Sequence, residues 1–299
     1  MKRTVILTGI TGFIGGELAR RLIKDGWTVA AIVRICSELS SIEDIHSDIK
    51  TYIYDGTNES LLAIMREVKP DVVFHLASLF LVEHTSEKIP ELINSNVLFG
   101  TQLLESMVVC GVNAFVNAGT SWQNYHSNEY RAVNLYAATK QAFEDILSFY
   151  VDKFKISSVT LQLFDTYGPN DKRRKLIKLL VEAFKNSYDL DLSPGDQIID
   201  ISYIDDVVEH FVRAGIYCLE QKTAKSECFY VSGSRLTVKE LVQDIRFFVR
   251  RDANITFGGR PYRDREVMYL PPVNAKTPPW NDAFVRTSLE QGVLKLIRK

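Results

Sequence analysis

Short apolar runs rich in β-branched residues alternate with longer stretches of helical periodicity, and this alternation limits the fold more than any other feature. The runs are apolar on both sides, which is typical of strands covered by helices on both faces of a sheet. Six strands are predicted at 4–8, 28–33, 51–54, 71–76, 113–118 and 157–163, with helices near 13–25, 58–68, 91–110 and 136–153. The sequence therefore predicts an α/β fold with a doubly wound parallel sheet.

The regular alternation of predicted strands and helices ends at about residue 165. A helix is expected near 173–187, followed by the turn-rich stretch 191–197, a strand and a helix over 198–219, a strand at 228–231, a helix at 237–250 and a last helix near 288–297. The segment 258–282 is rich in Gly, Pro and Arg. A stretch this long without periodicity either has a function or runs over the protein surface as an irregular segment.

Composition excludes several classes of protein. The net charge of −1 over 299 residues gives no reason to expect a nucleic acid or a membrane surface as partner. The four cysteines form no C-x-x-C and the five histidines have no metal-ligand spacing, so no metal is predicted. The chain begins in a strand-like segment and has no apolar run near the ~20 residues of a membrane span. We expect a cytoplasmic protein.

A glycine cluster, TGITGFIGG at 8–16, follows the first predicted strand and opens the first helix. Gly9, Gly12 and Gly15 permit a tight turn, close approach of backbone to a pyrophosphate and close packing of helix on strand. The helix N-terminus also favours an anion. A merely compact strand–helix turn is the alternative. We interpret the loop as a dinucleotide site, to which we also assign Thr11, Phe13 and Ile14.

The end of the second strand indicates which dinucleotide is bound. An NAD site usually has an acidic residue there for the ribose 2′-hydroxyl, whereas this chain has Arg34. A guanidinium could bind a 2′-phosphate through charge-assisted hydrogen bonds. We therefore predict NADPH in preference to NADH. In the alternative, Arg34 is a surface residue and other groups hold the adenosine.

The segment YAATK at 136–140 places Tyr136 and Lys140 on one face of the predicted helix. A nearby ammonium favours the phenolate and lowers a pKa that starts at about 10. Such a tyrosine could give a proton to a developing alkoxide near neutral pH. A chain with 13 tyrosines can contain this spacing by chance. Whether the pair is functional must therefore be judged from the other motifs of the chain.

Taken together, these motifs resemble the extended short-chain dehydrogenase/reductase family, over nearly the whole chain. TGITGFIG resembles its cofactor loop, HLAS at 75–78 its segment beneath the nicotinamide, and FVNAGTS at 115–121 its fifth strand. The resemblance implies that Tyr136 is a general acid/base, that Lys140 lowers its pKa and holds the nicotinamide ribose, and that Thr120 hydrogen-bonds the substrate oxygen. It adds as cofactor contacts Asp55, Gly56, Leu76, Ala77 and Ser78.

The resemblance also implies a division of the chain. A Rossmann dinucleotide-binding domain is expected over 1–165, with 198–222 returning to it. A smaller C-terminal substrate-binding lobe is expected from 166–197 and 223–299. Members of this family commonly form homodimers through helices that map here near 91–110 and 136–153, so a homodimer is predicted.

Family members of this kind mostly act on nucleotide-diphosphate sugars. Dehydratases carry an Asp-Glu pair after the catalytic threonine, where this chain has Ser121 and Trp122. Neither can do that proton chemistry, so dehydration is not expected. Arg34 suggests an exchangeable NADPH and therefore a 4-ketoreductase rather than an NAD-dependent 4-epimerase. A non-catalytic NADPH sensor is a further alternative, although such proteins typically lose the tyrosine or the lysine.

Within the family, the segments GDQIIDISYIDDVV (195–208) and YRDREVMY (262–269) resemble the CDP-abequose and CDP-paratose synthase group. That resemblance implies reduction of a CDP-4-keto-3,6-dideoxyhexose in deoxysugar biosynthesis of the O-antigen and lipopolysaccharide type, with dTDP- or GDP-linked sugars as alternatives. Ile199 stands where relatives often have a phosphate-binding arginine, and Asp165 where many have asparagine. Trp122 could line the sugar pocket or fill a core. The predicted substrate contacts are Ser121, Trp122, Asp165, Lys175 and Arg263.

Overall fold

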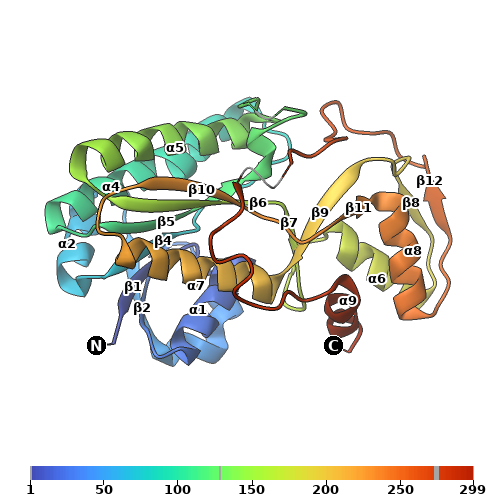
Figure 1. Ribbon diagram of the computed structural model, residues 1–299, viewed down its shortest axis with the longest axis horizontal. Helices are drawn as coiled ribbons and strands as arrows, with labels where there is room; N and C mark the ends of the chain where they lie inside the picture. Colours follow the sequence, from blue (N-terminus) through green and yellow to red (C-terminus); the bar gives the residue numbers. More distant parts are fainter. Residues whose placement is uncertain (1, 128, 273–275, 299) are drawn as a thin grey trace. The chain divides into compact units, whose positions relative to one another are not determined.

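The protein is represented by a computed structural model that describes residues 2–127, 129–272 and 276–298 (Figure 1). It divides into two compact units. Unit 1 contains Met1–Gln123, Asn134–Gln162 and Val208–Phe229, and unit 2 contains Asn124–Val133, Leu163–Val207 and Tyr230–Lys299. These units are groups of residues in close contact, and they are not the same as domains that fold independently. The division into a domain of 1–165 with 198–222 and a lobe of 166–197 with 223–299 stays a prediction.

A seven-stranded sheet in the order β10-β6-β5-β4-β1-β2-β3 is the centre of unit 1. The chain proceeds outward from β1 through β2 to β3 on one side and, after crossing back, through β4, β5 and β6 on the other. A parallel sheet that reverses its strand order in this way binds ligands outside the carboxyl ends of the strands at the reversal. The strands are β1 Thr4–Thr8, β2 Thr28–Arg34, β3 Ile49–Tyr54, β4 Val72–His75, β5 Ala114–Thr120, β6 Ser157–Leu163 and β10 Ser226–Val231.

Helices cover both faces of this sheet, and the predicted α/β Rossmann fold is confirmed. Figure 1 shows α2 (Asn58–Val68), α4 (Phe99–Cys110) and α5 (Leu135–Phe154) over one face, with α1 (Phe13–Lys24) and α7 (Ile204–Glu220) on the other. A continuous apolar core joins the sheet to α2, α4 and α5, with Phe115 and Phe143 fully buried in it. Burial on both faces explains why the strands are apolar throughout.

The helix expected near 91–110 is interrupted. It begins as α3 (Ile89–Ile93), passes through a π-helical turn over Asn94–Leu98 and continues as α4. Such turns inside a helix are frequent at functional sites. The buried side chain of Asn96 lies in this turn. The 3₁₀ segment Ser40–Asp48 after β2 was not predicted from the sequence.

In its described residues, unit 2 has two small sheets and three mutually packed helices. The first sheet has the order β11-β9-β7, and β12 pairs in parallel with β8. The turn-rich stretch 191–197 therefore begins inside a short strand that the sequence did not predict. The elements are β7 Asp165–Tyr167, α6 Leu176–Asn186, β8 Leu190–Leu192, β9 Ile198–Tyr203, β11 Ser234–Thr237, α8 Val238–Val249, β12 Ile255–Phe257 and α9 Leu289–Ile297.

The ends of the unit 2 helices are set by local sequence. Thr237 and Glu240 form a reciprocal capping box at the start of α8, and Ser288 and Gln291 form another at the start of α9. Each box gives hydrogen-bond acceptors to amides that the helix itself leaves without one. The segment 258–282 contains no strand or α-helix in its described residues.

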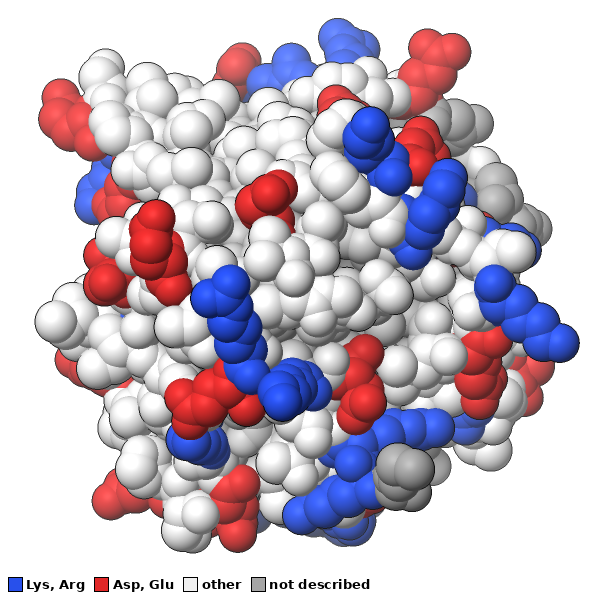
Figure 2. All heavy atoms as spheres, turned by 90° about the vertical axis from the view of Figure 1, so that its left-hand side faces the viewer, with Lys and Arg blue, Asp and Glu red and all other residues white. Residues whose placement is uncertain are grey.

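Figure 2 shows the side of the molecule that lies on the left in Figure 1. Lysines and arginines are interspersed there with acidic residues, and the middle of the face is largely uncharged. This face therefore presents no broad field of one sign that would attract a polyanion. In the part of the chain that the structure describes, no helix is both long and apolar enough to cross a membrane.

Candidate active site

The glycine loop is tightly closed between β1 and α1. Gly9 has φ +76°, and the amide of Gly12 donates to its carbonyl at 3.0 Å. A Cβ on Gly15 would lie 2.1 Å from the Gly9 oxygen, and one on Gly9 would lie 2.6 Å from the Ala77 nitrogen. Because Cβ atoms essentially cannot approach that closely, these positions require glycine. The predicted loop residues Thr11, Phe13 and Ile14 occupy the turn and the start of α1.

The amide end of α1 is built to receive an anion. Its N-cap residue is Gly12, which has no side chain to cap the first-turn amides. Partly positive amides at a helix N-terminus attract phosphate groups. The loop lies at the reversal of strand order beside β4, which places Leu76 and Ala77 against it. The residues present therefore fit a dinucleotide pyrophosphate.

Two further segments complete this edge of the sheet. Arg34 is exposed at the end of β2, where its amide donates to Ser37 Oγ at 3.1 Å and its carbonyl accepts from the Ser37 amide at 3.0 Å. Asp55 accepts hydrogen bonds from the side chain and amide of Thr57, which lower its pKa. Gly56 has φ +100°, a conformation that favours glycine.

The first turns of α5 carry the predicted tyrosine and lysine. Asn134 caps the helix by accepting from the Ala137 amide at 3.0 Å, and its Nδ2 donates to the carbonyls of Leu81 and Val82. Asn96 holds the same loop from the other side, because its Oδ1 accepts from Ser78 Oγ and the Leu79 amide. Hydrogen bonds therefore fix both the start of α5 and the segment after β4.

The ammonium of Lys140 is almost completely buried, with 2% of the residue exposed. Burial lowers its pKa to about 8, while the carboxylate of Glu144 opposes that shift. His75, at the end of β4, is also fully buried, and burial together with the Lys140 charge lowers its pKa to about 3. His75 is thus neutral, and one of its nitrogens contacts Thr8 Oγ1 at 2.9 Å.

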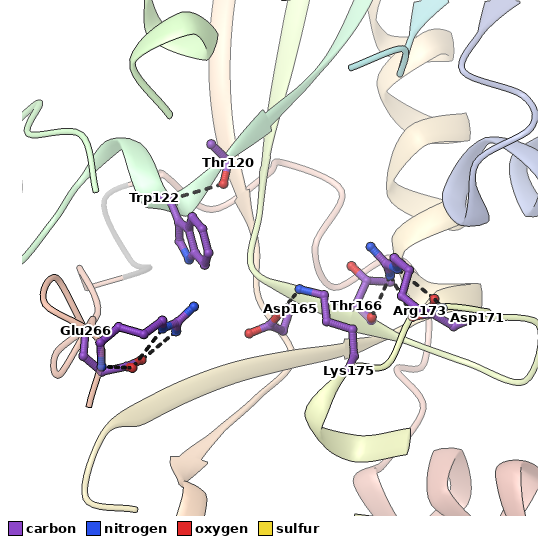
Figure 3. Close-up of polar contacts among 9 residues, drawn as sticks. Thr120, Trp122, Asp165, Thr166, Asp171, Arg173, Lys175 and Glu266 are labelled. Carbon is purple, nitrogen blue, oxygen red and sulfur yellow. Dashed lines mark hydrogen bonds and ion pairs between the residues drawn. The ribbon is translucent and has the colours of Figure 1, made fainter. Parts of the chain in front are cut away.

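The end of β5 brings Thr120 beside the same helix. Its amide donates to Gln123 Oε1 at 3.1 Å, and Gln123 Nε2 donates to Gln141 of α5 at 2.9 Å. Thr120 Oγ1 accepts from the Trp122 amide at 3.3 Å, as Figure 3 shows. The part played by Gln123 could not be predicted from the sequence, because both contacts depend on the folded turn after β5.

An aromatic residue that the sequence did not single out joins these parts. The Phe80 ring lies edge-on to Tyr136 at 5.0 Å between ring centroids and 5.5 Å from Trp122. Half-exposed rings with this geometry give an apolar wall beside the phenol. Tyr136, Trp122 and Thr120 are therefore brought into one region of unit 1.

The predicted cationic residues of unit 2 are paired with carboxylates. Lys175 Nζ lies 3.1 Å from Asp165 Oδ1, and Arg263 Nη2 lies 2.7 Å from Glu266 Oε1. Figure 3 shows both contacts, together with the bonds from Arg173 to Asp171 and to the carbonyl of Thr166. A phosphate bound by Lys175 or Arg263 would have to compete with these carboxylates.

Asp200 follows Ile199, the residue that stands where relatives often have arginine. The Asp200 side chain has a structural role. Its carboxylate is buried and accepts from Ser232 Oγ at 2.6 Å, the Gly233 amide at 2.8 Å and Arg235 Nε at 3.1 Å. Burial raises its pKa, and these contacts oppose that shift. Three donors on one buried carboxylate hold the turn after β10 against β9. Within the described ranges, no group of three or more His, Cys, Asp or Glu side chains is arranged to hold a metal ion.

Comparison with known proteins places the chain in a family. The model of the NAD dependent epimerase/dehydratase family matches residues 5–222. The chain belongs to this family. The family predicted from the motifs is therefore confirmed, and the glycine loop, Thr120, Tyr136 and Lys140 all lie in the part of this family member that the model matches.

Individual relatives agree with this membership. The chain is 30% identical over 270 residues to the CDP-abequose synthase of Yersinia pseudotuberculosis, covering 88% of this chain and 90% of the relative. The UDP-glucose 4-epimerase of Thermotoga maritima with UDP-glucose superposes with a TM-score of 0.82 at 21% identity, covering 99% and 97%. The Thermus thermophilus UDP-glucose 4-epimerase complex with NAD gives a TM-score of 0.79 at 21% identity, covering 99% and 98%. These solved structures show the same fold.

Replacing Gly15 by Ala should disrupt the loop, because the new methyl group would overlap the Gly9 carbonyl. We expect dinucleotide affinity, measured by titration calorimetry, to fall at least about tenfold, or 1.4 kcal/mol. Gly16→Ala is the matched control, since its Cβ would approach nothing closer than 3.3 Å. Equal affinities for the two variants would contradict the assignment of this loop.

Proposed function

We propose that this protein reduces the C4 keto group of a nucleotide-diphosphate 4-keto-6-deoxy- or 3,6-dideoxyhexose with NADPH. A CDP-4-keto-3,6-dideoxyglucose in deoxysugar (O-antigen type) biosynthesis is the substrate we favour. The observation that carries the proposal is the buried ammonium of Lys140, one helical turn from Tyr136. That arrangement suits proton transfer to an oxygen that gains charge during reduction.

In the proposed reaction, bound NADPH supplies a hydride to C4 and is oxidised. Tyr136 gives its phenolic proton to the C4 oxygen, which completes the alcohol. Lys140 stabilises the phenolate left behind and holds the nicotinamide ribose. Thr120 orients the carbonyl through its hydroxyl. The amide end of α1 and the residues Leu76, Ala77 and Ser78 hold the dinucleotide, with Asp55 and Gly56 near its adenine.

The residues after Thr120 favour reduction over dehydration. Expulsion of water from the sugar needs an additional acid and base, and Ser121 and Trp122 supply neither. The Trp122 ring packs against Phe80, so it contributes apolar surface to the proposed sugar site. The similarity to a CDP-abequose synthase supports the choice of a CDP-linked deoxysugar.

The second candidate is an NAD-dependent nucleotide-sugar 4-epimerase. It is favoured by the likeness to solved UDP-glucose 4-epimerases, one of them in complex with NAD. Both reactions can use the same tyrosine and lysine. They differ in cofactor use, because an epimerase regenerates its NAD in each turnover whereas a reductase consumes NADPH. We place the reductase first because Arg34 stands at the end of β2.

We expect Tyr136→Phe to lower kcat for NADPH-dependent reduction of a CDP-4-keto sugar by 10²- to 10⁴-fold, the usual contribution of general acid catalysis. Dinucleotide affinity should change less than about threefold, since the ring and its packing remain. The assay follows NADPH absorbance, with Tyr188→Phe as a control at an exposed site of unit 2. Turnover at the wild-type rate would show that Tyr136 is not the acid.

Arg34→Asp should lower the affinity for NADPH at least about tenfold relative to the affinity for NADH, because the 2′-phosphate would then meet a like charge. Calorimetric titration with both cofactors gives the ratio directly. Arg66→Asp, at an exposed position of α2, makes the same charge change away from the site. An equal loss for both cofactors would contradict the 2′-phosphate role of Arg34.

We also propose a homodimer formed through α4 and α5. Val109 on α4 and Phe149 on α5 are 54% and 56% exposed, and these two helices pack against each other. Exposed apolar surface on adjacent helices is typical of a protein interface. Light scattering at micromolar concentration should give twice the chain mass, and Val109→Lys with Phe149→Lys should give the monomer. Phe247→Lys, on α8, should leave the mass unchanged. A monomeric wild-type protein would contradict the proposal.

A further inference from the structure

The helix α5 carries a third ionisable side chain in register with the proposed pair. Tyr136, Lys140 and Glu144 follow one another at four-residue intervals, so they share one face of the helix. The chemistry proposed above uses the first two residues and leaves Glu144 without a role. Glu144 is only partly exposed, and its charge acts on Lys140 strongly enough to oppose the effect of burial.

Gly119 of strand β5 leaves room for the Glu144 carboxylate. A Cβ built on Gly119 would lie 3.0 Å from Glu144 Oε1 and 2.8 Å from Thr160 Cγ2. Glycine weakens a strand and often marks the close approach of another group. Here the missing side chain of Gly119 leaves the space beside Glu144 Oε1. Because Gly119 directly precedes Thr120, the carboxylate lies directly behind the end of β5.

Among the described residues, the other ionisable group that senses the Lys140 charge supplies no negative charge. This group is His75 of β4, which is buried and neutral. Among the groups that interact with Lys140, Glu144 is thus the carboxylate that can balance its charge.

We propose that Glu144 is a positioning residue whose carboxylate is the counter-charge that keeps the buried Lys140 ammonium protonated and directed toward Tyr136. This inference rests on the role proposed above for Lys140. Its physical basis is that a buried cation without a counter-charge loses its proton, and an opposite charge a few ångströms away restores it.

The sign of the effect follows from the protonation of lysine. Lys140 acts as an ammonium below its pKa of about 8 and loses its charge as the pH rises through that value. Removing the Glu144 charge should lower this pKa further. A neighbouring opposite charge shifts a pKa by about one to three units, so we expect a fall of at least about one unit. At pH 7 about half or more of the Lys140 side chains in Glu144→Gln would then be neutral.

The experiment measures Lys140 itself. Protein labelled with [¹³C]lysine is titrated by NMR, and the Lys140 signal is assigned by its loss in Lys140→Arg. We expect a midpoint near pH 8 in the wild type and at least about one unit lower in Glu144→Gln. Asp145→Asn, the next residue on the exposed side of α5, is the matched control and should leave the midpoint unchanged. An unchanged midpoint in Glu144→Gln would overturn the proposal.

A second measurement separates this inference from the proposed function. Dinucleotide affinity is measured against pH for the wild type and both variants. The pH at which affinity declines should move down with the Lys140 midpoint in Glu144→Gln and not in Asp145→Asn. Absence of dinucleotide binding at every pH would contradict the proposed function, whereas the NMR midpoints would still decide the role of Glu144.

A conservative variant covers the case in which Glu144→Gln fails to fold, as judged by circular dichroism. Glu144→Asp keeps the charge but withdraws it by one methylene group, so the Lys140 midpoint should fall by less than in Glu144→Gln and remain below that of the wild type. A midpoint equal to the wild type in a folded Glu144→Asp, with no folded glutamine variant, would count against the proposal.

Discussion

The burial of one ammonium group is the constraint on which the rest of the candidate site depends. Lys140 lies in the α5 face that packs on the central sheet, where a charge is costly unless other groups compensate it. The buried neighbour His75 stays neutral, and the carboxylate of Glu144 supplies an opposite charge. A lysine held in this way has a lowered pKa and a fixed position. Both properties suit a residue that assists proton transfer from the Tyr136 phenol.

The start of α5 is held as firmly as the lysine. Asn134 caps the helix and binds the loop after β4, while Asn96 binds that loop from the π-helical turn and donates to Thr139 Oγ1 at 3.0 Å. Two asparagines thus connect α5, the segment after β4 and the helix before α4. This arrangement fixes the Tyr136 ring beside Phe80, and preorganisation of this kind reduces the rearrangement that a reaction needs.

Much of the fold and part of the site could be predicted from the sequence because those features are local. The glycine loop and the Tyr136–Lys140 spacing depend on a few successive residues and on the period of one helix. Phe80, Gln123 and Glu144 escaped prediction, because each acts through a partner in another element. The short strands of unit 2 also escaped it, since three-residue strands carry too little periodicity.

In the proposed reduction, hydride passes from NADPH to C4 of a 4-keto sugar and stays there. The most direct test uses NADPH deuterated at the transferable position with CDP-4-keto-3,6-dideoxyglucose, followed by NMR of the product. The reductase account predicts one deuterium at C4 for each NADPH oxidised. A 4-keto sugar recovered unreduced and without deuterium, together with NAD that stays bound through purification, would contradict reduction and favour the epimerase.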